Sequence, residues 1–425
     1  MAKDIDRKKV FSWAFYDWEN SAFATTVIAG FFPVFFKQYW SSGTEFTVST
    51  FRLGAANSIA SLVIVALAPV LGTIADKGGT KKKFLLFFAI MGIVMTGALS
   101  LVSEGNWGFA VLLYVLGFVG FSGGNVFYNS LIVDITGPRK VDFVSALGFS
   151  MGYLGGGILF AFNVFMTLRP ALFGLTGQSE AIRISFISVA VWWALFSIPI
   201  FLFVKEPVVR ARLKGWQAIS GGLRQLSMTF REIRRLRVVF LFLLGYWLYI
   251  DGVDTIVRMV VDYGLSLGFD VNSLIIALLI TQFVGFPSAL VFGKIGEKLC
   301  AKTGILIGIS VFITVTIWAF FMDSATEFYA LAVAIGLVQG GVLSLSCSFY
   351  TRIIPLNKSA EFFGFYSMLG KFAAVIGPAL MGWVGFVSGT PRVGILSIAL
   401  LLASGAVILY FVDEGEGIRM AKALE

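Results

Sequence analysis

Twelve long apolar segments divide this chain, separated by short charged or Gly/Pro-containing breaks. A helix needs roughly 20 apolar residues to cross the hydrocarbon core of a bilayer. The predicted spans are residues 11–38, 51–75, 83–102, 107–133, 142–168, 182–204, 238–263, 271–293, 303–322, 327–351, 361–387 and 392–412. Charged residues make up only 13% of the chain, whereas a soluble domain usually carries about 25%. The sequence therefore predicts an all-α membrane protein with twelve transmembrane helices.

The basic residues are distributed unevenly between the two sides of these spans. Of 33 Lys and Arg residues, 26 fall on the side of the N-terminus and five on the other side, while Arg258 and Lys371 lie inside spans. The positive-inside rule then places both termini in the cytoplasm. Residues 205–237 are predicted to form a basic cytoplasmic linker with an amphipathic helix on the anionic leaflet. This placement explains the net charge of +9 without a nucleic-acid partner. The short loops favour a bacterial inner membrane.

A compact basic turn follows the second span. It runs from Gly72 through Asp76, Lys77 and Gly79 to Lys81. The pattern resembles the signature loop between helices 2 and 3 of the major facilitator superfamily, whose Asp and basic residues hold the outward-open state. The resemblance implies a gating role for Asp76, Lys77 and Lys81. The alternative interpretation is an ordinary solvated turn on the positive side of the membrane.

The same turn recurs after the eighth span, at a constant offset of 221 residues. The matching pairs are Gly72 and Gly293, Ile74 and Ile295, Asp76 and Glu297, Lys77 and Lys298, and Lys81 and Lys302. A second repeat relates residues 127–128 to 349–350 and residues 151–152 to 369–370. Secondary transporters are commonly built from two such corresponding halves. We therefore predict an N-terminal six-helix bundle over residues 1–204, the linker over 205–237 and a C-terminal six-helix bundle over 238–425, with the two bundles pseudo-symmetric.

The first span carries polar side chains that lipid tolerates poorly: Asp17, Glu19 and Asn20. A charged residue at the centre of a membrane helix costs about 2.5–3.5 kcal/mol on insertion scales, so such groups normally face an aqueous cavity or a partner. We expect this helix to line a pathway and these three residues to bind solute or couple ions. Asp17 lies only six residues from the predicted start of the span, so a role in gating or capping the helix end is the alternative.

A polar stripe runs along the seventh span. Trp247, Asp251, Asp254 and Arg258 follow i, i+4, i+7 and i+11 spacing, which places them on one face of a helix. Asp254 precedes Arg258 by four residues, the favourable order for an intrahelical ion pair. Asp251 has no such partner nearby in the sequence. Asp251 and Trp247 are therefore candidates for solute binding or coupling.

Lys371 lies in the middle of the eleventh span, too far from either end to extend easily to water. We expect it either to pair with a carboxylate of the first or seventh helix or to hold an anionic group of the solute. Further uncharged candidates for the cavity lining are Asn57, Asn125, Tyr128, Asn129, Asn163, Gln282 and Gln339. The alternative for each of them is an interhelical hydrogen bond.

Three patches of the chain carry a closer resemblance. They are residues 16–18 with 20–24 (YDW and NSAFA), residues 249 with 251–253 (Y and DGV), and residues 365–371 (FYSMLGK). Together they resemble the vacuolar amino-acid effluxer family and its bacterial relatives over the whole chain. The resemblance implies amino-acid transport, since fungal members are linked to release of amino acids from the vacuole. Glu19 departs from the pattern, which has alanine there, and adds a carboxylate two residues from Asp17.

The predicted function is secondary active transport of a small polar or zwitterionic solute, such as an amino acid, by alternating access and coupled to protons. Histidine is absent, so a coupling proton would reside on carboxylates, where desolvation and a nearby cation act in opposite directions. The alternatives are an efflux pump for lipophilic compounds and a non-transporting receptor or lipid scramblase.

Other activities are disfavoured by missing motifs. The chain has no nucleotide-binding loop, and its two cysteines form no metal-ligand pattern. We therefore expect no ATP-driven transport, no enzyme activity, no cofactor and no metal. The expected partners are the solute, protons and the bilayer, with the chain acting as a monomer.

Overall fold

The computed structural model describes residues 6–44, 46–137, 139–206, 231, 233, 236–267 and 269–423. Within these ranges it leaves the side chains at 46, 47, 50, 51, 77, 258, 261, 262, 265, 266, 271, 272, 373–375 and 391 undescribed. Every regular element in this part of the chain is a helix. Apolar segments favour helices in lipid because a helix satisfies its own backbone N–H and C=O groups. The predicted linker 205–237 lies mostly outside the described residues.

The N-terminal half begins with a helical segment that is continuous from Arg7 to Trp40 but irregular. It consists of α1 (Arg7–Ala22), the π-helical η1 (Phe23–Phe31), α2 (Phe32–Phe35) and the π-helical η2 (Phe36–Trp40). The remaining elements of this half are α3 (Phe46–Gly78), α4 (Lys81–Ala98), η3 (Leu99–Leu101), α5 (Trp107–Ser130), α6 (Ile132–Ile135), α7 (Val141–Leu168), η4 (Pro170–Phe173) and α8 (Gln178–Phe203).

The C-terminal half repeats this arrangement. Its elements are α10 (Arg237–Ser266), α11 (Val271–Lys298), α12 (Ala301–Phe321), α13 (Ala325–Ile353), η5 (Leu356–Lys358), α14 (Ser359–Ser388), α15 (Pro391–Tyr410) and the short α16 (Glu414–Lys422). Eleven helices of the described chain are individually long and apolar enough to cross a membrane, and the interrupted segment 7–40 is the twelfth. The predicted twelve-helix membrane architecture is confirmed.

Helix boundaries differ from the predicted spans at several ends. The first helix begins at Arg7 rather than residue 11, because the Asp6 side chain accepts the backbone N–H of Lys9 at 3.4 Å and caps the helix. Asp17 therefore lies ten residues, not six, from the helix start, which is about 15 Å at the rise of an α-helix. Because its first turn is polar, the helix extends beyond the apolar residues that define the predicted span.

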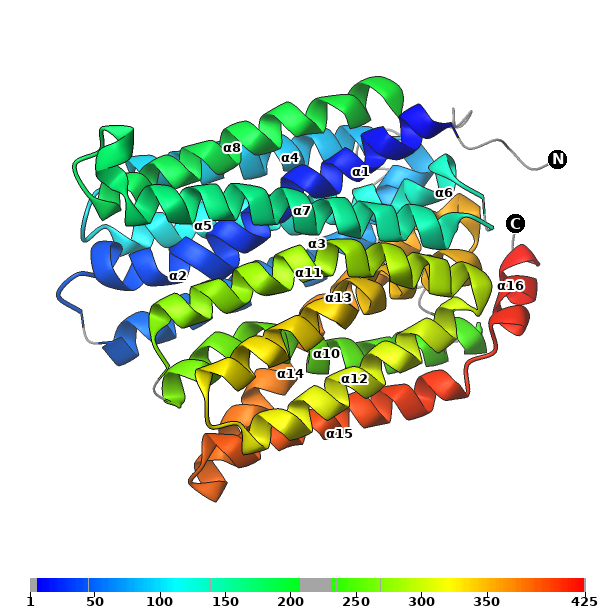
Figure 1. Ribbon diagram of the computed structural model, residues 1–425. Coiled ribbons are helices and arrows are strands. Elements are labelled where there is room, and N and C mark those ends of the chain that lie inside the picture. Colours follow the sequence, from blue (N-terminus) through cyan, green and yellow to red (C-terminus); the bar gives the residue numbers. More distant parts are fainter. Residues whose placement is uncertain are drawn as a thin grey trace.

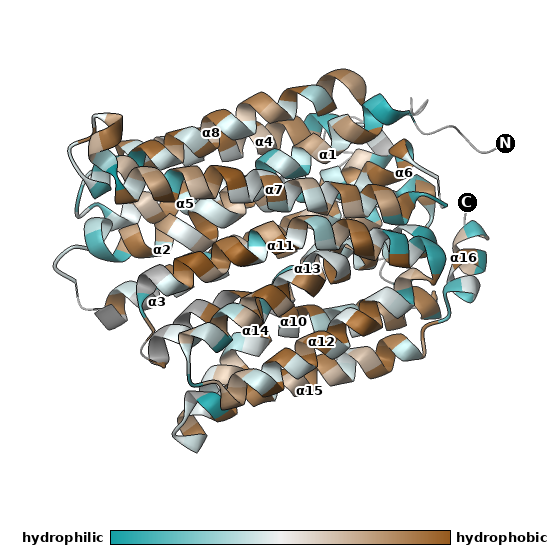
Figure 2. Ribbon diagram, viewed as in Figure 1, coloured by the Kyte–Doolittle hydropathy of each residue, from teal (hydrophilic) through white to brown (hydrophobic). Residues whose placement is uncertain are grey.

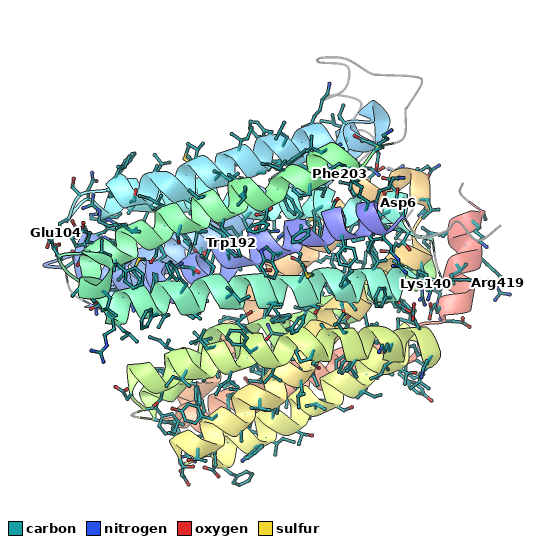
Figure 3. All side chains as sticks on the ribbon, turned by 45° about the horizontal axis from the view of Figure 1, so that its top comes forward. Asp6, Glu104, Lys140, Trp192, Phe203 and Arg419 are labelled. Atoms are coloured by element: carbon teal, nitrogen blue, oxygen red, sulfur yellow. The ribbon has the colours of Figure 1, made fainter. Side chains whose placement is uncertain are left out.

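The long helices lie side by side in two bundles, and both chain ends emerge at the same end of the molecule (Figure 1). We call this end the terminal face and the other end the opposite face. Hydrophobic residues dominate the middle of the helices, while hydrophilic residues gather towards the two ends (Figure 2). Lys140 and Arg419 lie at the terminal face and Glu104 at the opposite face (Figure 3). This banding is the pattern expected of a protein that spans a bilayer.

The two halves share a hydrophobic core at the terminal side. One cluster of buried residues contains Trp13 and Phe127 of the N-terminal half together with Phe242 and Tyr350 of the C-terminal half. A second core lies inside the N-terminal half towards the opposite face; its members include Phe23, Phe32, Trp40 and Trp193, with Leu278 and neighbouring residues of α11 packed against it. Across the boundary, α7 packs along α11 and α13, and α3 packs along α14.

Candidate functional site

Asp17 and Glu19 point in different directions from α1. Residues i and i+2 of a helix project about 200° apart around its axis, so the two carboxylates contact different neighbours. Asp17 is half-buried and faces α7, where a Cβ atom at Gly152 would lie 3.1 Å from the Asp17 Cγ atom. Glu19 is fully buried and faces α8, where the Ser197 hydroxyl donates to Glu19 Oε1 at 2.9 Å. Asp17 thus lies against α7, the helix that borders the C-terminal half, whereas Glu19 faces α8 inside its own half.

Small residues on α7 allow α1 to approach closely. Gly156 stands where a Cβ atom would come within 3.0 Å of the Ser21 carbonyl oxygen. Trp18 fits over Gly155 in the same way and stacks on Trp192 of α8 at 5.6 Å between ring centroids. Such small-residue faces permit tight helix packing in membranes. The glycines of α7 therefore fix the position of the polar part of α1.

Several other N-terminal candidates lie on or beside α5, whereas Asn163 lies on α7 and accepts the Ser188 hydroxyl of α8 at 3.0 Å. The Asn20 amide donates a hydrogen bond to the Asn125 side chain. Tyr128 is buried between two rings of α1, with centroid distances of 4.5 Å to Trp13 and 5.0 Å to Tyr16. Its hydroxyl is buried without a hydrogen-bond partner among the described residues. Asn129, the next residue, is half-buried.

The C-terminal candidates divide in the same way. Asp251 is buried inside its own half, where its Oδ1 atom accepts the backbone N–H of Gly377 on α14 at 2.9 Å. Asp254, one turn further along α10, is half-buried, and so is Trp247. The side chain of Arg258 lies outside the described part of the chain, so the predicted ion pair of Asp254 with Arg258 stays a prediction.

Two candidates of the C-terminal half reach the N-terminal half. The Lys371 ammonium of α14 lies 4.8 Å from the centre of the Phe118 ring on α5, a cation–π geometry. Gln282 of α11 packs against α7, where a Cβ atom at Gly157 would lie 3.1 Å from the Gln282 Cβ atom. Both side chains therefore lie at the boundary between the halves.

Tyr153 of α7 is a side chain on which carboxylates of both halves act electrostatically. Its hydroxyl lies within electrostatic range of both Asp17 and Asp254. Asp17 also acts on Tyr128 and on the buried thiol of Cys347 of α13. We call these five residues, Asp17, Tyr128, Tyr153, Asp254 and Cys347, the interface cluster. It combines two acidic groups with three groups that can donate hydrogen bonds.

The predicted gating turn of the N-terminal half contacts the start of α14. The Asp76 carboxylate accepts the backbone N–H of Glu361 at 2.8 Å. The Lys81 ammonium lies 3.5 Å from Asp76 and 3.4 Å from Asp134, and it donates to the Ser359 hydroxyl at 2.7 Å. A carboxylate at a helix N-terminus is favourable because the exposed N–H groups carry partial positive charge.

Two glycines of this turn have separate reasons to be glycine. Gly72 allows backbone contact between the halves, since a Cβ atom there would overlap the carbonyl oxygen of Ala360. Gly79 adopts a positive φ of 56°, which glycine accepts without steric cost. The Lys77 side chain is outside the described part of the structure.

The repeated turn of the C-terminal half makes the reciprocal contact. Glu297 lies 3.3 Å from the ammonium of Lys140, the residue that precedes α7, while Lys298 is exposed beside it. Since α7 and α14 are corresponding helices, each turn meets the start of the equivalent helix in the other half. The sequence repeat therefore appears in the structure as a pair of matching contacts.

Sequence reasoning missed a second set of charges at the terminal face. Arg352 of α13 pairs with Asp142 of α7 across the boundary, and with Glu414 of α16 at 2.7 Å. The backbone N–H of Glu416 lowers the pKa of Asp413, which caps α16. The charged positions at 142 and 352 lie at predicted span ends, where a charge is normally solvated, so the sequence offered no signal for the pairing. Tyr153 was missed because an isolated aromatic residue in a span usually faces lipid or core.

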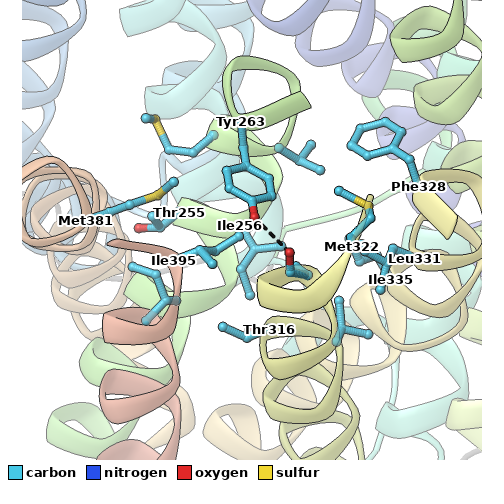
Figure 4. A pocket seen from close by; sticks show the side chains of 15 residues that line it. Thr255, Ile256, Tyr263, Thr316, Met322, Phe328, Leu331, Ile335, Met381 and Ile395 are labelled. Atoms are coloured by element: carbon cyan, nitrogen blue, oxygen red, sulfur yellow. Dashed lines mark hydrogen bonds between the residues drawn. The ribbon is translucent and has the colours of Figure 1, made fainter. Parts of the chain in front are cut away.

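A separate pocket lies within the C-terminal half and is almost entirely apolar (Figure 4). Ile256, Met259, Phe328 and Met381 are among its lining residues. The Tyr263 hydroxyl at its edge donates to the carbonyl oxygen of Ala319 at 2.7 Å. This pocket contains none of the predicted site residues.

Comparison of the sequence with known proteins agrees with the two-bundle helical arrangement described above. The family described as "Vacuole effluxer Atg22 like" matches residues 40–141 and 139–422. The MFS-type transporter YxiO of Bacillus subtilis (strain 168) is 37% identical over 416 residues, covering 96% of this chain and 95% of that protein. Autophagy-related protein 22 of Yarrowia lipolytica (strain CLIB 122 / E 150) is 23% identical over 455 residues, covering 87% of this chain and 76% of the fungal protein.

A solved structure gives the same answer for the fold. The proton:xylose symporter XylE of the major facilitator superfamily superposes with a TM-score of 0.73 over 98% of both chains, at 12% identity. The family match covers nearly the whole chain, and the two halves, the repeated turns and the membrane-spanning helices fit it. The chain therefore belongs to the Atg22-like effluxer family and is a multi-pass transporter of the major facilitator superfamily.

Proposed function

We propose that the chain transports a small zwitterionic solute of the amino-acid type across a bacterial inner membrane, by alternating access and coupled to protons. The observation that supports this most directly is that acidic and basic groups of both halves lie inside the bundle, at or near the boundary. Asp17 lies against Gly152 of α7, the charges of Asp17 and Asp254 both act on the Tyr153 hydroxyl, and the Lys371 ammonium lies 4.8 Å from the centre of the Phe118 ring on α5. An ammonium group of the solute would be held by the carboxylates and its carboxylate by Lys371.

Contacts at the terminal face support the alternating-access part of this proposal. Charged pairs join the two halves there at Lys140 and Glu297 and at Asp142 and Arg352, and the first turn of α14 is bound to Asp76. At the opposite face, the ion pair between Arg392 and Asp323 lies within the C-terminal half. We assign the structure to a state closed at the terminal face, and we place that face in the cytoplasm because of its basic residues.

Asp17 is the best candidate for the coupling proton. It is half-buried at the boundary, where a change of conformation alters its access to water. Glu19 and Asp251 are buried inside their own halves and bonded to Ser197 and Gly377. A proton on Asp17 would weaken its attraction for the ammonium group of the solute, and this competition couples the two bindings.

Counterflow in proteoliposomes tests the solute class. Vesicles containing purified protein are loaded with one unlabelled amino acid, and uptake of the same labelled amino acid is measured across a panel. We expect transient accumulation for at least one member. Lys371→Gln should weaken it for amino acids but not for an amine that lacks a carboxylate. No accumulation of any member would remove amino acids as the solute class.

Proton coupling requires a separate measurement. Uptake driven by an imposed pH gradient is compared with counterflow at equal pH on both sides. Asp17→Asn should abolish the gradient-driven uptake, whereas counterflow should persist with a raised KM, because exchange does not need net proton movement but the neutral amide attracts the ammonium group of the solute less strongly. A gradient-driven component that survives in Asp17→Asn would contradict the assignment.

The apolar pocket of Figure 4 favours a second candidate, efflux of lipophilic compounds. Its lining of Ile, Val, Met and Phe side chains would suit an apolar ligand but offers no charged group to a zwitterion. Including a lipophilic cation in the same proteoliposome panel separates the two functions. Met381→Trp should reduce transport of the lipophilic compound and leave amino-acid counterflow unchanged.

A further inference from the structure

The ring of Tyr153 is inserted between two helices of the other half. A Cβ atom at Gly285 of α11 would lie 2.8 Å from the Tyr153 Cδ1 atom, and one at Gly340 of α13 would lie 2.8 Å from the Cε2 atom. Real Cβ atoms essentially never come this close to another heavy atom. The two glycines therefore form a notch between α11 and α13 that a larger residue at either position would close. The Tyr153 ring fills this notch, and the residue as a whole is 8% exposed.

The notch lies within a row of contacts that α7 makes with the C-terminal half. Towards the terminal face, the Ser150 hydroxyl donates to the Phe286 carbonyl oxygen at 2.8 Å, and the Ser145 hydroxyl donates to the Ser344 carbonyl oxygen at 2.8 Å. One turn beyond Tyr153, Gly157 packs on Gln282. Within this row Tyr153 is the large side chain that crosses into the other half between two helices at once.

The position of Tyr153 also fits the proposed solute site. Gly152, the residue before Tyr153, lies against the Asp17 side chain, and the charges of Asp17 and Asp254, one from each half, act on the Tyr153 hydroxyl. A phenol can both donate and accept a hydrogen bond, so it can bridge an ammonium group and a carboxylate. The ring and the hydroxyl can therefore have different roles, and substitutions can separate them.

We propose that Tyr153 is a positioning residue whose ring, seated between Gly285 and Gly340, holds the two halves in the state closed at the terminal face, and whose hydroxyl contacts the transported solute. The second role rests on the proposed transport function, whereas the first depends only on the packing. Opening the terminal face requires the ring to leave the notch. Solute bound at the hydroxyl therefore changes how readily the ring leaves the notch.

Distances between spin labels test the role of the ring. Arg139→Cys and Lys298→Cys place labels on two exposed residues of opposite halves, beside the pair of Lys140 and Glu297. Cys300→Ser removes the partly exposed native thiol and keeps a capping side chain. In this background, the doubly labelled protein with Gly285, Gly340 and Tyr153 unchanged should show a population with a short distance between the labels, which corresponds to the closed terminal face.

Gly340→Ala should lower the short-distance population about tenfold, the effect expected when a methyl group is forced into a filled site. Gly285→Ala should act in the same direction through the other edge of the ring. Gly108→Ala is the matched control, because a Cβ atom there would meet nothing within 4 Å, and it should leave the distances unchanged.

A double-mutant cycle identifies Tyr153 as the group that the added methyl strikes. In a Tyr153→Ala background, Gly340→Ala should have no further effect on the distances. Tyr153→Phe keeps the ring and should retain the short-distance population. Two results would overturn the role of the ring: a distance distribution in both glycine variants like that of Gly108→Ala, or an undiminished effect of Gly340→Ala without the tyrosine.

Counterflow tests the role of the hydroxyl in the same variants. Tyr153→Phe should raise the KM for counterflow about tenfold, as expected for a lost hydrogen bond to a charged group, while the closed population stays as before. An unchanged KM would overturn the hydroxyl contact alone. If no amino acid is transported by any variant, the transport proposal fails, and the spin-label distances still decide the role of the ring.

Discussion

At the scale of single residues, environment separates carboxylates that look equivalent in the sequence. Asp17 lies against Gly152 of α7, the helix that borders the other half, whereas Glu19 is buried inside its own half, where its Oε1 atom accepts the Ser197 hydroxyl. The second oxygen, Glu19 Oε2, is buried without a hydrogen-bond partner among the described residues. An ionised carboxylate in that position would be costly, so we infer that Glu19 is neutral in this state.

Substituting Glu19 tests this inference. Glu19→Gln should leave the thermal unfolding midpoint and the counterflow rate close to wild type, because a neutral amide has the shape of the protonated acid and can still accept from Ser197. Glu19→Ala should lower the midpoint clearly, since it leaves a cavity and an unpaired hydroxyl. The midpoint is measured by thermal unfolding in detergent. Loss of counterflow in Glu19→Gln would instead indicate a direct role in transport.

Asp251 allows a similar test. Asp251→Asn retains an oxygen that can accept the backbone N–H of Gly377, so folding and gradient-driven uptake should both persist. Asp251→Ala removes the acceptor from a buried N–H group, at a cost of about 1–3 kcal/mol in stability. Unfolding midpoints and pH-driven uptake are measured on both variants. If Asp251→Asn abolishes the gradient-driven component, Asp251 and not Asp17 carries the coupling proton.

At the scale of elements, the short helix α16 supports a contact between the two halves. Gly417 seats it against α10 and α13, since a Cβ atom there would lie 2.7 Å from Ile353 and 2.8 Å from Val238. Its Glu414 holds the Arg352 side chain that also pairs with Asp142 of the N-terminal half. A C-terminal helix thus orients a charge that joins the two halves at the terminal face.

Removing the Glu414 carboxylate should therefore favour opening. We expect Glu414→Ala to reduce the short-distance population of labels at Arg139→Cys and Lys298→Cys by about three- to tenfold, in line with the loss of a partly buried charged hydrogen bond. Glu416→Ala is the control, because Glu416 is an exposed glutamate of the same helix. Equal distances in the two variants would mean that α16 has no part in closure.

At the scale of the whole molecule, the two halves meet through reciprocal contacts. The turn after α3 binds the start of α14, and the turn after α11 binds the residue before α7. The shared core at the terminal side adds apolar packing to these polar contacts. In the proposed alternating-access cycle, opening breaks all of these contacts together, which favours two discrete states over a continuous range.

Amide hydrogen exchange tests this cooperation. Gly72→Ala should speed exchange in the first turn of α14, where the Glu361 N–H is bound to Asp76, because the added methyl group overlaps the Ala360 carbonyl. Exchange at the start of α7 should rise as well, although it lies far from the substitution in the chain. Gly54→Ala on the same helix, where a Cβ atom meets nothing within 4 Å, should change neither. Faster exchange at α14 alone would argue against a concerted opening.

The sequence by itself determined the twelve spans and the two repeated turns for which a gating role is predicted. These follow from the length of apolar runs and from local spacing, which do not depend on distant contacts. It also identified Asp17, Glu19, Asp251 and Lys371 as charges that need a polar setting, and Asp254 as the partner of Arg258. The tertiary structure decided which charges face the boundary. Successive residues of a helix project about 100° apart, and the direction that faces the other half is known only when the neighbouring helices are placed.

Contacts between distant segments were decided by the tertiary structure alone. Tyr153 meets Gly285 and Gly340, and Asp142 meets Arg352, across separations of more than 130 residues. No local sequence pattern predicts such pairs, because each residue is compatible with its own helix whichever residue of the other half it contacts. The packing of two bundles against each other selects them, and the closed state depends on that selection.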